Sequence, residues 1–299
     1  MGLKFPRFQL PAPGKLNLCL NITGRRVDGY HELQTAFHIL SIGDLIDFEA
    51  AENIEVICDQ IIQEENLVFK AANTLAEFAL NQSNKESKRP FGARITVNKV
   101  LPMGAGLGGG SSDAATTLVG LNLMWQLRLD TEMLLTLARP LGADLPVFVK
   151  GCSAWAEGIG ERLTPINLLP KHYVVIQPNC EISTAEIFSH RDLTRDSAPI
   201  TIARFLEQGS GNDCEAVARK LYPEVDKAIL WLNKWGPAKM TGTGSCVFLD
   251  FDSKNEAEAV CREVPEKWHV FIAEGLDESP LLRKVKLLKE SFDNVSREV

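Results

Sequence analysis

The sequence of 299 residues lacks several features that mark membrane, secreted or disordered proteins. It has no run of about 18 apolar residues, so no segment is long enough for a membrane-spanning helix. Residues 1–6 have no apolar stretch that leads to a small-residue cleavage site, so we expect the chain to stay in the cytoplasm. The composition, 45% apolar and 24% charged, is that of a folded protein.

An excess of basic residues is also missing. The chain has 32 Lys and Arg against 39 Asp and Glu, a formal net charge of −7, and its basic residues do not cluster. A surface that coats nucleic acid or an anionic membrane requires such a cluster, so we predict neither partner. The sequence carries no signal for an oligomeric state.

Cysteine and histidine lack the spacings that carry chemistry. The seven cysteines are odd in number and include no C-x-x-C pair, and the five histidines include no H-E-x-x-H. We therefore expect neither a disulfide framework nor a zinc site, which suits a reducing cytosol.

Hydrophobic periodicity predicts an α+β protein with two lobes, residues 1–165 and 166–299. Residues 15–21 alternate as a half-buried strand does, with Lys15 and Asn17 on the polar face. The polar residues 81–90 predict a surface loop. Further predicted strands are residues 94–100, 173–176, 246–249 and 270–273, and predicted helices are residues 67–79, 111–127, 131–139, 224–235 and 257–264.

The strongest signal is a glycine-rich segment between a predicted strand and a predicted helix, with five glycines within residues 104–110. Glycine lets successive backbone N–H groups point at one ligand, and a helix N-terminus adds unpaired donors, so the segment predicts a phosphate-binding loop. Two hydroxyls at its end are suited to cap the helix and to reach a phosphate or its magnesium ion. The predicted loop comprises Pro102, Met103, Gly104, Ala105, Gly106, Leu107, Gly108, Gly109, Gly110, Ser111 and Ser112.

Other interpretations of this loop remain open from the residues alone. It is also compatible with a mobile loop before an N-capped helix. Residues 104–109 satisfy G-x-G-x-x-G, and Asp130 lies at about the distance at which a dinucleotide fold holds a ribose, although little room remains for the second strand of such a fold. A Walker A loop is excluded, because no Gly-Lys-Ser/Thr follows.

Several other residues each allow a structural and a functional interpretation. Lys15 is either a solvated edge charge or the partner of Asp144, and Asp144, at a helix end between a glycine and a proline, is otherwise a turn or cap residue. Residues 241–245, Thr-Gly-Thr-Gly-Ser, either approach a ligand closely or close a hairpin. Tyr30 and His31, beside a flexible loop, are either packing residues or ligand contacts.

Taken in order, the segments at residues 11–17, 102–112, 142–146 and 241–246 resemble the motifs of the GHMP kinases, and the resemblance covers about residues 11–280. Residues 23–33, Thr-Gly-Arg-Arg-Val-Asp-Gly-Tyr-His-Glu-Leu, are similar to the branch that acts on a cytidine-diphosphate-linked methylerythritol. The resemblance implies an N-terminal lobe like ribosomal S5 domain 2, a ferredoxin-like C-terminal lobe and a site between them. It also implies that ATP, with Mg²⁺, phosphorylates the 2-hydroxyl of that substrate on the non-mevalonate route to isoprenoid precursors.

The resemblance also implies a role for individual residues. Asp144 corresponds to the catalytic aspartate and Lys15 to its partner, which fits a carboxylate that accepts the proton of an alcohol. Ser112 is expected to help hold magnesium, whose other ligands stay undefined. For the substrate, the implied contacts are Tyr30 and Phe188 on the two faces of the base, His31 at the pyrimidine edge, Asn17 beside Lys15, and Thr184.

Overall fold

A computed structural model describes residues 7–59, 61–82 and 91–295. Most of the predicted loop at residues 81–90 therefore lies outside the described residues. The other predicted helices and strands are present, with ends shifted by a few residues. The α+β class is confirmed, and no helix in these ranges combines the length and the apolar character that crossing a bilayer requires.

The N-terminal lobe is built on two long antiparallel strands, β1 (Arg7–Arg25) and β2 (His31–Glu49). Two further strands pair antiparallel with β2, namely β4 (Ala93–Asn98) and β5 (Ala154–Glu157). β3 (Ile54–Ile57) pairs parallel with β4, and β6 (Arg162–Pro165) pairs antiparallel with β5. This sheet shares an apolar core with helices α1 (Leu67–Gln82), α2 (Gly109–Met124), α3 (Thr131–Ala138) and α4 (Leu145–Lys150). Two short 3₁₀ turns, η1 (Gln63–Glu65) and η2 (Arg139–Leu141), precede α1 and α4.

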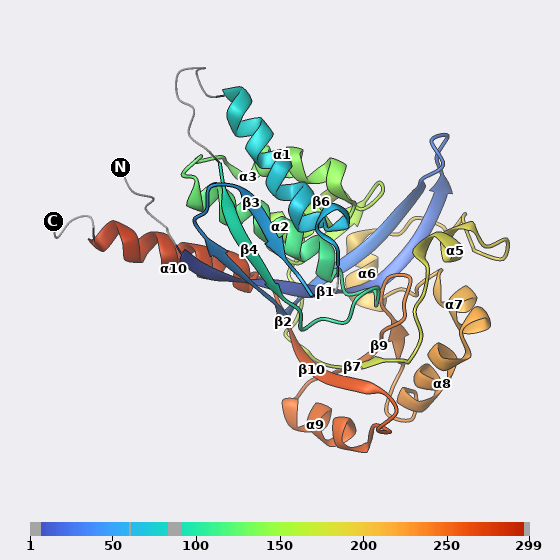
Figure 1. Cartoon of the computed structure of the whole chain (residues 1–299). Helices are drawn as coiled ribbons and strands as arrows, with labels where there is room; N and C mark the ends of the chain where they lie inside the picture. Colours follow the sequence, from blue (N-terminus) through green and yellow to red (C-terminus); the bar gives the residue numbers. More distant parts are fainter. Residues whose placement is uncertain (1–6, 60, 83–90, 296–299) are drawn as a thin grey trace.

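The C-terminal lobe has the ferredoxin-like strand order that was expected. Its four strands lie antiparallel in the order β10 (His269–Leu276), β7 (His172–Gln177), β9 (Val247–Phe251) and β8 (Lys239–Met240). Helices α7 (Glu215–Leu221), α8 (Pro223–Leu232) and α9 (Lys254–Glu263) gather around these strands (Figure 1). Between β7 and α7 lie two shorter helices, α5 (Thr184–Ser189) and α6 (Ile202–Gln208).

The two lobes are joined through the sheet itself. Gly275 and Leu276 of β10 pair with Leu40 and Ile39 of β2, so one sheet runs through both lobes. The last helix, α10 (Pro280–Val295), returns to the first lobe and buries part of its apolar face in that lobe's core. The boundary at residues 165 and 166 stays a prediction, and α10 belongs by its packing to the N-terminal lobe.

The first strand is longer and more deeply buried than its sequence indicates. The alternation at residues 15–21 predicts a half-buried strand, and this is wrong because the sheet, the glycine loop and the second lobe cover both faces. Cys19 is 1% exposed although it belongs to the predicted polar set, and a register shift lies between Asn17 and Leu20. Lys15 and Asn17 are therefore buried, so each needs polar partners.

Candidate active site

A cavity of about 890 Å³ lies where β1, the glycine-rich loop, the start of α4, α5 and the loop at residues 241–245 meet. This volume is in the range of small-molecule sites. Leu107 and Ser112, at most 1% exposed, are not among its lining residues. The other predicted site residues all line it: Lys15, Asn17, Tyr30, His31, Pro102, Met103, Gly104, Ala105, Gly106, Gly108, Gly109, Gly110, Ser111, Asp144, Thr184 and Phe188.

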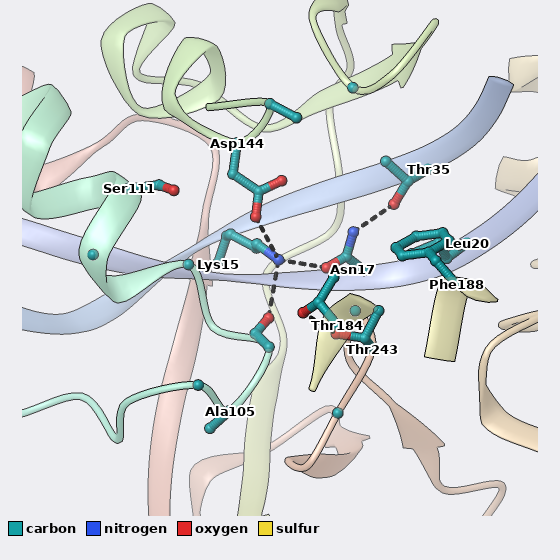
Figure 2. Close-up of a pocket in the computed structure, with 18 of the residues that line it drawn as sticks. Lys15, Asn17, Leu20, Thr35, Ala105, Ser111, Asp144, Thr184, Phe188 and Thr243 are labelled. Atoms are coloured by element: carbon teal, nitrogen blue, oxygen red, sulfur yellow. Dashed lines mark hydrogen bonds and ion pairs between the residues drawn. The ribbon is translucent and has the colours of Figure 1, made fainter. Parts of the chain in front are cut away.

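Lys15 and Asp144 form an ion pair at the centre of this cavity (Figure 2). Nζ of Lys15 lies 3.3 Å from Oδ2 of Asp144 and donates to Oδ1 of Asn17 at 2.5 Å and to the carbonyl oxygen of Gly106 at 2.9 Å. The lysine side chain is 3% exposed and the aspartate 35%. The ammonium group is thus held by three oxygens inside the protein, while the carboxylate faces the cavity.

Asp144 owes its position to the chain turn before α4. It directly precedes that helix, with helical backbone angles and no side-chain capping bond. A cap role is therefore absent, because a capping carboxylate would accept a backbone N–H of the first turn. Pro146 lies in that first turn, where its missing N–H costs no hydrogen bond. The carboxylate is free to face Lys15.

Asn17 joins the first strand to two other segments of the site. Its backbone N–H donates to Oγ1 of Thr241 at 2.9 Å, and its Nδ2 donates to Oγ1 of Thr35 at 2.8 Å. Thr241 in turn donates to the carbonyl oxygen of Gly106 at 3.2 Å. The loop at residues 241–245 therefore does two things. It closes the hairpin between β8 and β9, and it contacts the glycine-rich loop.

The glycine-rich loop packs too closely for larger residues. Gly106 has φ +80°, and a Cβ there would lie 2.2 Å from the carbonyl oxygen of Thr241. At Gly108, with φ +73°, a Cβ would lie 2.9 Å from the Phe148 ring and 3.1 Å from Cε of Lys15. These glycines are required by close approach as well as by their left-handed backbone.

The helix after the loop begins earlier than predicted. α2 starts at Gly109, and its N-cap is Gly108, which makes no side-chain capping bond. The expectation that Ser111 or Ser112 caps the helix is therefore wrong, because both lie inside its first turn. With no side-chain cap, the first backbone N–H groups of α2 stay available to an anion in the cavity.

The two serines face different surroundings. Ser111 lines the cavity, on the same side of the Lys15–Asp144 pair as α2 in Figure 2. Ser112 is 0% exposed, and its hydroxyl has no hydrogen-bond partner among the described residues. Of these two hydroxyls, only that of Ser111 belongs to a residue that lines the cavity.

The dinucleotide interpretation of the loop is wrong. Asp130 is the N-cap of α3 and accepts the backbone N–H of Met133 at 2.9 Å. It is not among the residues that line the cavity. Its spacing from the glycines is a coincidence, because the residues between them form one helix and a turn instead of a second strand.

The opposite end of the cavity carries aromatic residues. Tyr30 is 61% exposed at the β1–β2 turn, and His31 begins β2. The rings of His31 and Phe188 stack with centroids 5.1 Å apart and an interplanar angle of 24°. Thr184 shares a hydrogen bond of 3.0 Å with Thr243. In Figure 2, Phe188 and Ser111 lie on opposite sides of the Lys15–Asp144 pair.

Lys99 is a cavity residue that the sequence analysis missed. It follows β4 directly, lines the cavity and donates to Oδ2 of Asp44 at 2.5 Å and to Oδ2 of Asp113 at 2.8 Å. Burial raises the pKa of Asp113 to about 7, against the opposing effect of Lys99. The sequence does show a lysine three residues before the glycine-rich loop, which could have drawn attention to it. Its pairing with Asp44 and Asp113 follows no sequence pattern.

Two family models match the chain. That of the GHMP kinases N terminal domain covers residues 66–152, and that of the GHMP kinases C terminal region covers residues 192–270. Together they span more than half of the chain, on both sides of the cavity. The chain therefore belongs to the GHMP kinases, as the order of its motifs implies.

Individual relatives narrow this class. A 4-diphosphocytidyl-2-C-methyl-D-erythritol kinase of Marinomonas sp. (strain MWYL1) is 47% identical over 94% of this chain and 91% of its own length. One of Hahella chejuensis (strain KCTC 2396) is 46% identical over 93% and 96%. The crystal structure of a 4-(cytidine 5'-diphospho)-2C-methyl-D-erythritol kinase superposes with a TM-score of 0.76 and 32% identity, covering 90% of this chain and all of that one. The chain therefore belongs to the family of the 4-diphosphocytidyl-2-C-methyl-D-erythritol kinases.

Proposed function

We propose that the protein transfers the γ-phosphoryl group of ATP to the 2-hydroxyl of 4-diphosphocytidyl-2-C-methyl-D-erythritol, giving the 2-phosphate and ADP, in the non-mevalonate route to isoprenoid precursors. The observation that carries the proposal is the Lys15–Asp144 pair, which lies between a phosphate-binding loop and an aromatic surface in one cavity. Each end of the cavity suits one substrate, and the pair lies where the two would meet.

The reacting hydroxyl needs a proton acceptor, because an alcohol is a poor nucleophile. Asp144 offers its carboxylate to the cavity, and Lys15, fixed by Asn17 and Gly106, holds that carboxylate in place and offsets negative charge. As the bond from the hydroxyl oxygen to phosphorus forms, the proton moves to Oδ of Asp144 and the electron pair of the broken bond stays with ADP. Orientation of this kind can supply roughly 7–11 kcal/mol of the barrier.

The glycine-rich loop and the start of α2 are proposed to bind the phosphates of ATP. Their backbone N–H groups and the positive end of the helix stabilise the negative charge on the phosphate oxygens, so few charged side chains are needed for this. Lys99 lines the cavity beside this loop, since a Cβ on Gly109 would lie 3.3 Å from its Nζ. Its charge is offset by Asp44 and Asp113, so its part is to hold these carboxylates beside the loop.

Magnesium fits this arrangement as an ion carried mainly by ATP. No group of three or more His, Cys, Asp or Glu side chains suited to a metal occurs in the described ranges. Mg²⁺ usually keeps several waters and takes one or two protein ligands besides phosphate oxygens, and the hydroxyl of Ser111 can provide one of them. The bound ion would neutralise charge on the β- and γ-phosphates.

The aromatic end is proposed to bind the cytidine. Tyr30 and Phe188 offer ring faces for the base, with His31 at its edge, and a planar base gains stacking energy there. A mevalonate or homoserine kinase, which would share the loops, has no need of such rings. This difference favours the cytidyl substrate over the other acceptors of the same class.

Release of ADP by the purified protein tests the proposal. ATP and Mg²⁺ are offered with 4-diphosphocytidyl-2-C-methyl-D-erythritol, mevalonate or homoserine in parallel reactions. We expect turnover with the cytidyl substrate alone. Turnover only with mevalonate or homoserine would overturn the substrate assignment, and binding of ATP without turnover of any acceptor would indicate a nucleotide-binding module.

A further inference from the structure

Arg195 is bonded to two of the three aromatic residues at the end of the cavity that is proposed to bind the base, His31 and Phe188. It lies half-buried in the segment between α5 and α6. Its Nε donates to Nε2 of His31 at 3.2 Å, and its Nη2 donates to the carbonyl oxygens of Phe188 at 2.9 Å and His190 at 2.8 Å. Nη1 donates to the carbonyl oxygen of Leu193 at 3.1 Å. One guanidinium group thus connects the end of α5 to the start of β2.

The two rings that Arg195 connects come from different lobes. His31 belongs to the N-terminal β-hairpin and Phe188 to α5, yet their rings stack 5.1 Å apart. A stack between separate elements keeps its geometry only if both backbones are held. The bonds of Arg195 hold one ring by its nitrogen and the other by its backbone carbonyl.

We propose that Arg195 is a positioning residue for the pyrimidine, which fixes the Phe188 ring for the face of the base and the His31 ring for its edge as one preformed platform. This inference rests on the proposed function, because it assigns the platform to the cytidyl end of that substrate. A preformed surface improves affinity because less conformational freedom is lost on binding. Arg195 itself acts through the two rings and is assigned no contact with the reacting atoms.

The hydrogen bond from Arg195 also sets the chemical form of His31. A guanidinium group has only donors and stays charged, so Nε2 of His31 must offer its lone pair. The proton of the neutral ring is then on Nδ1, for which the described part of the chain shows no hydrogen-bond partner. Burial, followed by the positive charges of Arg195 and Arg25, lowers the pKa of His31, which keeps the ring neutral near pH 7.

Lysine cannot replace arginine in this arrangement. The planar guanidinium group directs several N–H bonds along fixed directions, whereas a lysine offers one ammonium group at the end of a flexible stem. Arg195→Lys keeps the positive charge beside His31 but cannot reach His31, Phe188 and His190 together. The pair of variants Arg195→Lys and Arg195→Met therefore separates the effect of geometry from that of charge.

Arg219→Met is the matched control. Arg219 is also half-buried in the second lobe, but its guanidinium group pairs with Glu215 and Asp226, and it does not line the cavity. The exchange removes the same charge and the same volume. Any general effect of losing a paired arginine from this lobe appears in the control as well.

The experiment has a spectroscopic and a functional part. The ¹⁵N chemical shifts of the His31 ring in the free protein report its tautomer, and titration with cytidine diphosphate reports the Kd of the base end. For wild type and Arg219→Met we expect a single tautomer protonated on Nδ1. For both Arg195 variants we expect mixed tautomers, a Kd for cytidine diphosphate and a KM for the cytidyl substrate raised about tenfold, and kcat and the KM for ATP changed by less than about twofold.

The outcomes keep this inference apart from the proposed function. An Nε2-protonated His31 in wild type, or an unchanged Kd and KM in both Arg195 variants, would overturn the platform. An equal rise in the KM for ATP would indicate general damage to the site and would also overturn it. If wild type binds cytidine diphosphate more tightly than both Arg195 variants but does not phosphorylate the cytidyl substrate, the platform stands and the proposed reaction is wrong.

Discussion

The ammonium nitrogen of Lys15 lies 3.3 Å from Oδ2 of Asp144, although the two side chains are exposed to very different degrees, 3% and 35%. Burying an ammonium group is costly unless it is paired and hydrogen-bonded, and Lys15 meets both conditions with Asp144, Asn17 and Gly106. The ammonium group therefore lies inside the protein, and the carboxylate, which is the proposed proton acceptor, lies at the cavity surface. This is the arrangement that a base acting on a bound alcohol requires.

Replacing Asp144 by Asn should remove the proton acceptor with little change of shape. We expect kcat to fall by about 10²–10⁴-fold, with binding of ATP largely retained. Steady-state kinetics and ATP titration check this. Asp130→Asn is the control, because that side chain caps α3, a position in which Asn is equally suited, and it lies outside the cavity. Near-normal turnover of Asp144→Asn would remove Asp144 from the mechanism.

Replacing Tyr30 by Ala should weaken binding of the base and leave the fold intact, because the side chain is 61% exposed. We expect the KM for the cytidyl substrate to rise by an amount equivalent to about 1–3 kcal/mol. Val27→Ala, at the exposed tip of the same turn and outside the cavity lining, is the matched control. A KM equal to that of wild type would mean that the base binds elsewhere.

Gly106→Ala should disrupt the contact between the two loops behind the site. The new Cβ would lie 2.2 Å from the carbonyl oxygen of Thr241, at a φ of +80° that alanine rarely adopts. We expect a loss of at least about 2 kcal/mol in the free energy of unfolding. Gly110→Ala is the comparison, because its nearest neighbour would be Cδ1 of Leu67 at 3.9 Å. There the change should stay within about 1 kcal/mol. Equal stability of the two variants would contradict the close packing.

Lys99→Met should leave two buried carboxylates without a cation. Asp44 and Asp113 are 0% and 5% exposed, and Nζ of Lys99 lies 2.5 Å and 2.8 Å from their oxygens. We expect the free energy of unfolding to fall by about 3–5 kcal/mol, and a second exchange, Asp113→Asn, to restore part of it. Lys171→Met removes a more exposed lysine that pairs with Asp250 and Asp252, and it should cost about 0–1 kcal/mol. Denaturant unfolding of wild type and of these three variants checks this. The absence of any recovery in the double variant would show that the carboxylate is not the source of the loss.

The site loops were predictable because their signals are local. Glycines at residues 104–110 allow the left-handed backbone and the close approach that such a loop needs, and the alternation at residues 15–21 marks a strand. β2 was not predicted, since its residues 34–40 are all buried and so both faces of the strand are covered there. A period of two persists only where one face of a strand stays covered.

The roles of Lys99 and Arg195 could not be predicted for a related reason. Asp44 is 55 residues before Lys99, and His31 is 164 residues before Arg195. Contacts at such separations leave no periodic trace in the sequence. Lys99 meets Asp44 only when β2 pairs with β4, and Arg195 meets His31 only when the two lobes pack together. Most residues that line the cavity were thus predictable from motifs, whereas the contacts of Lys99 and Arg195 required the structure.

His38 should make stability depend on pH in the acid range. The ring is 1% exposed, its Nδ1 lies 2.8 Å from the hydroxyl oxygen of Tyr173, and its Nε2 has no partner in the described part of the chain. Burial lowers its pKa to about 4, against a small opposing effect of Asp277. The unfolded chain, with a histidine pKa of about 6.5, takes up the proton first. The contribution of a neutral His38 is therefore complete above pH 6.5 and is lost as the pH falls toward 4.

His38→Gln keeps a partner for Tyr173 and removes the titrating ring. We expect the difference in free energy of unfolding between wild type and this variant to shrink by about 3 kcal/mol between pH 6.5 and 4, measured by denaturant unfolding at each pH. His269→Gln, at an exposed position, shows how much of the change any exchange of histidine for glutamine produces. A difference that is constant over this range would mean that folding does not change the pKa of His38, and one that grows toward low pH would mean that folding raises it. In either case the charged ring would have to donate from Nδ1 to Tyr173.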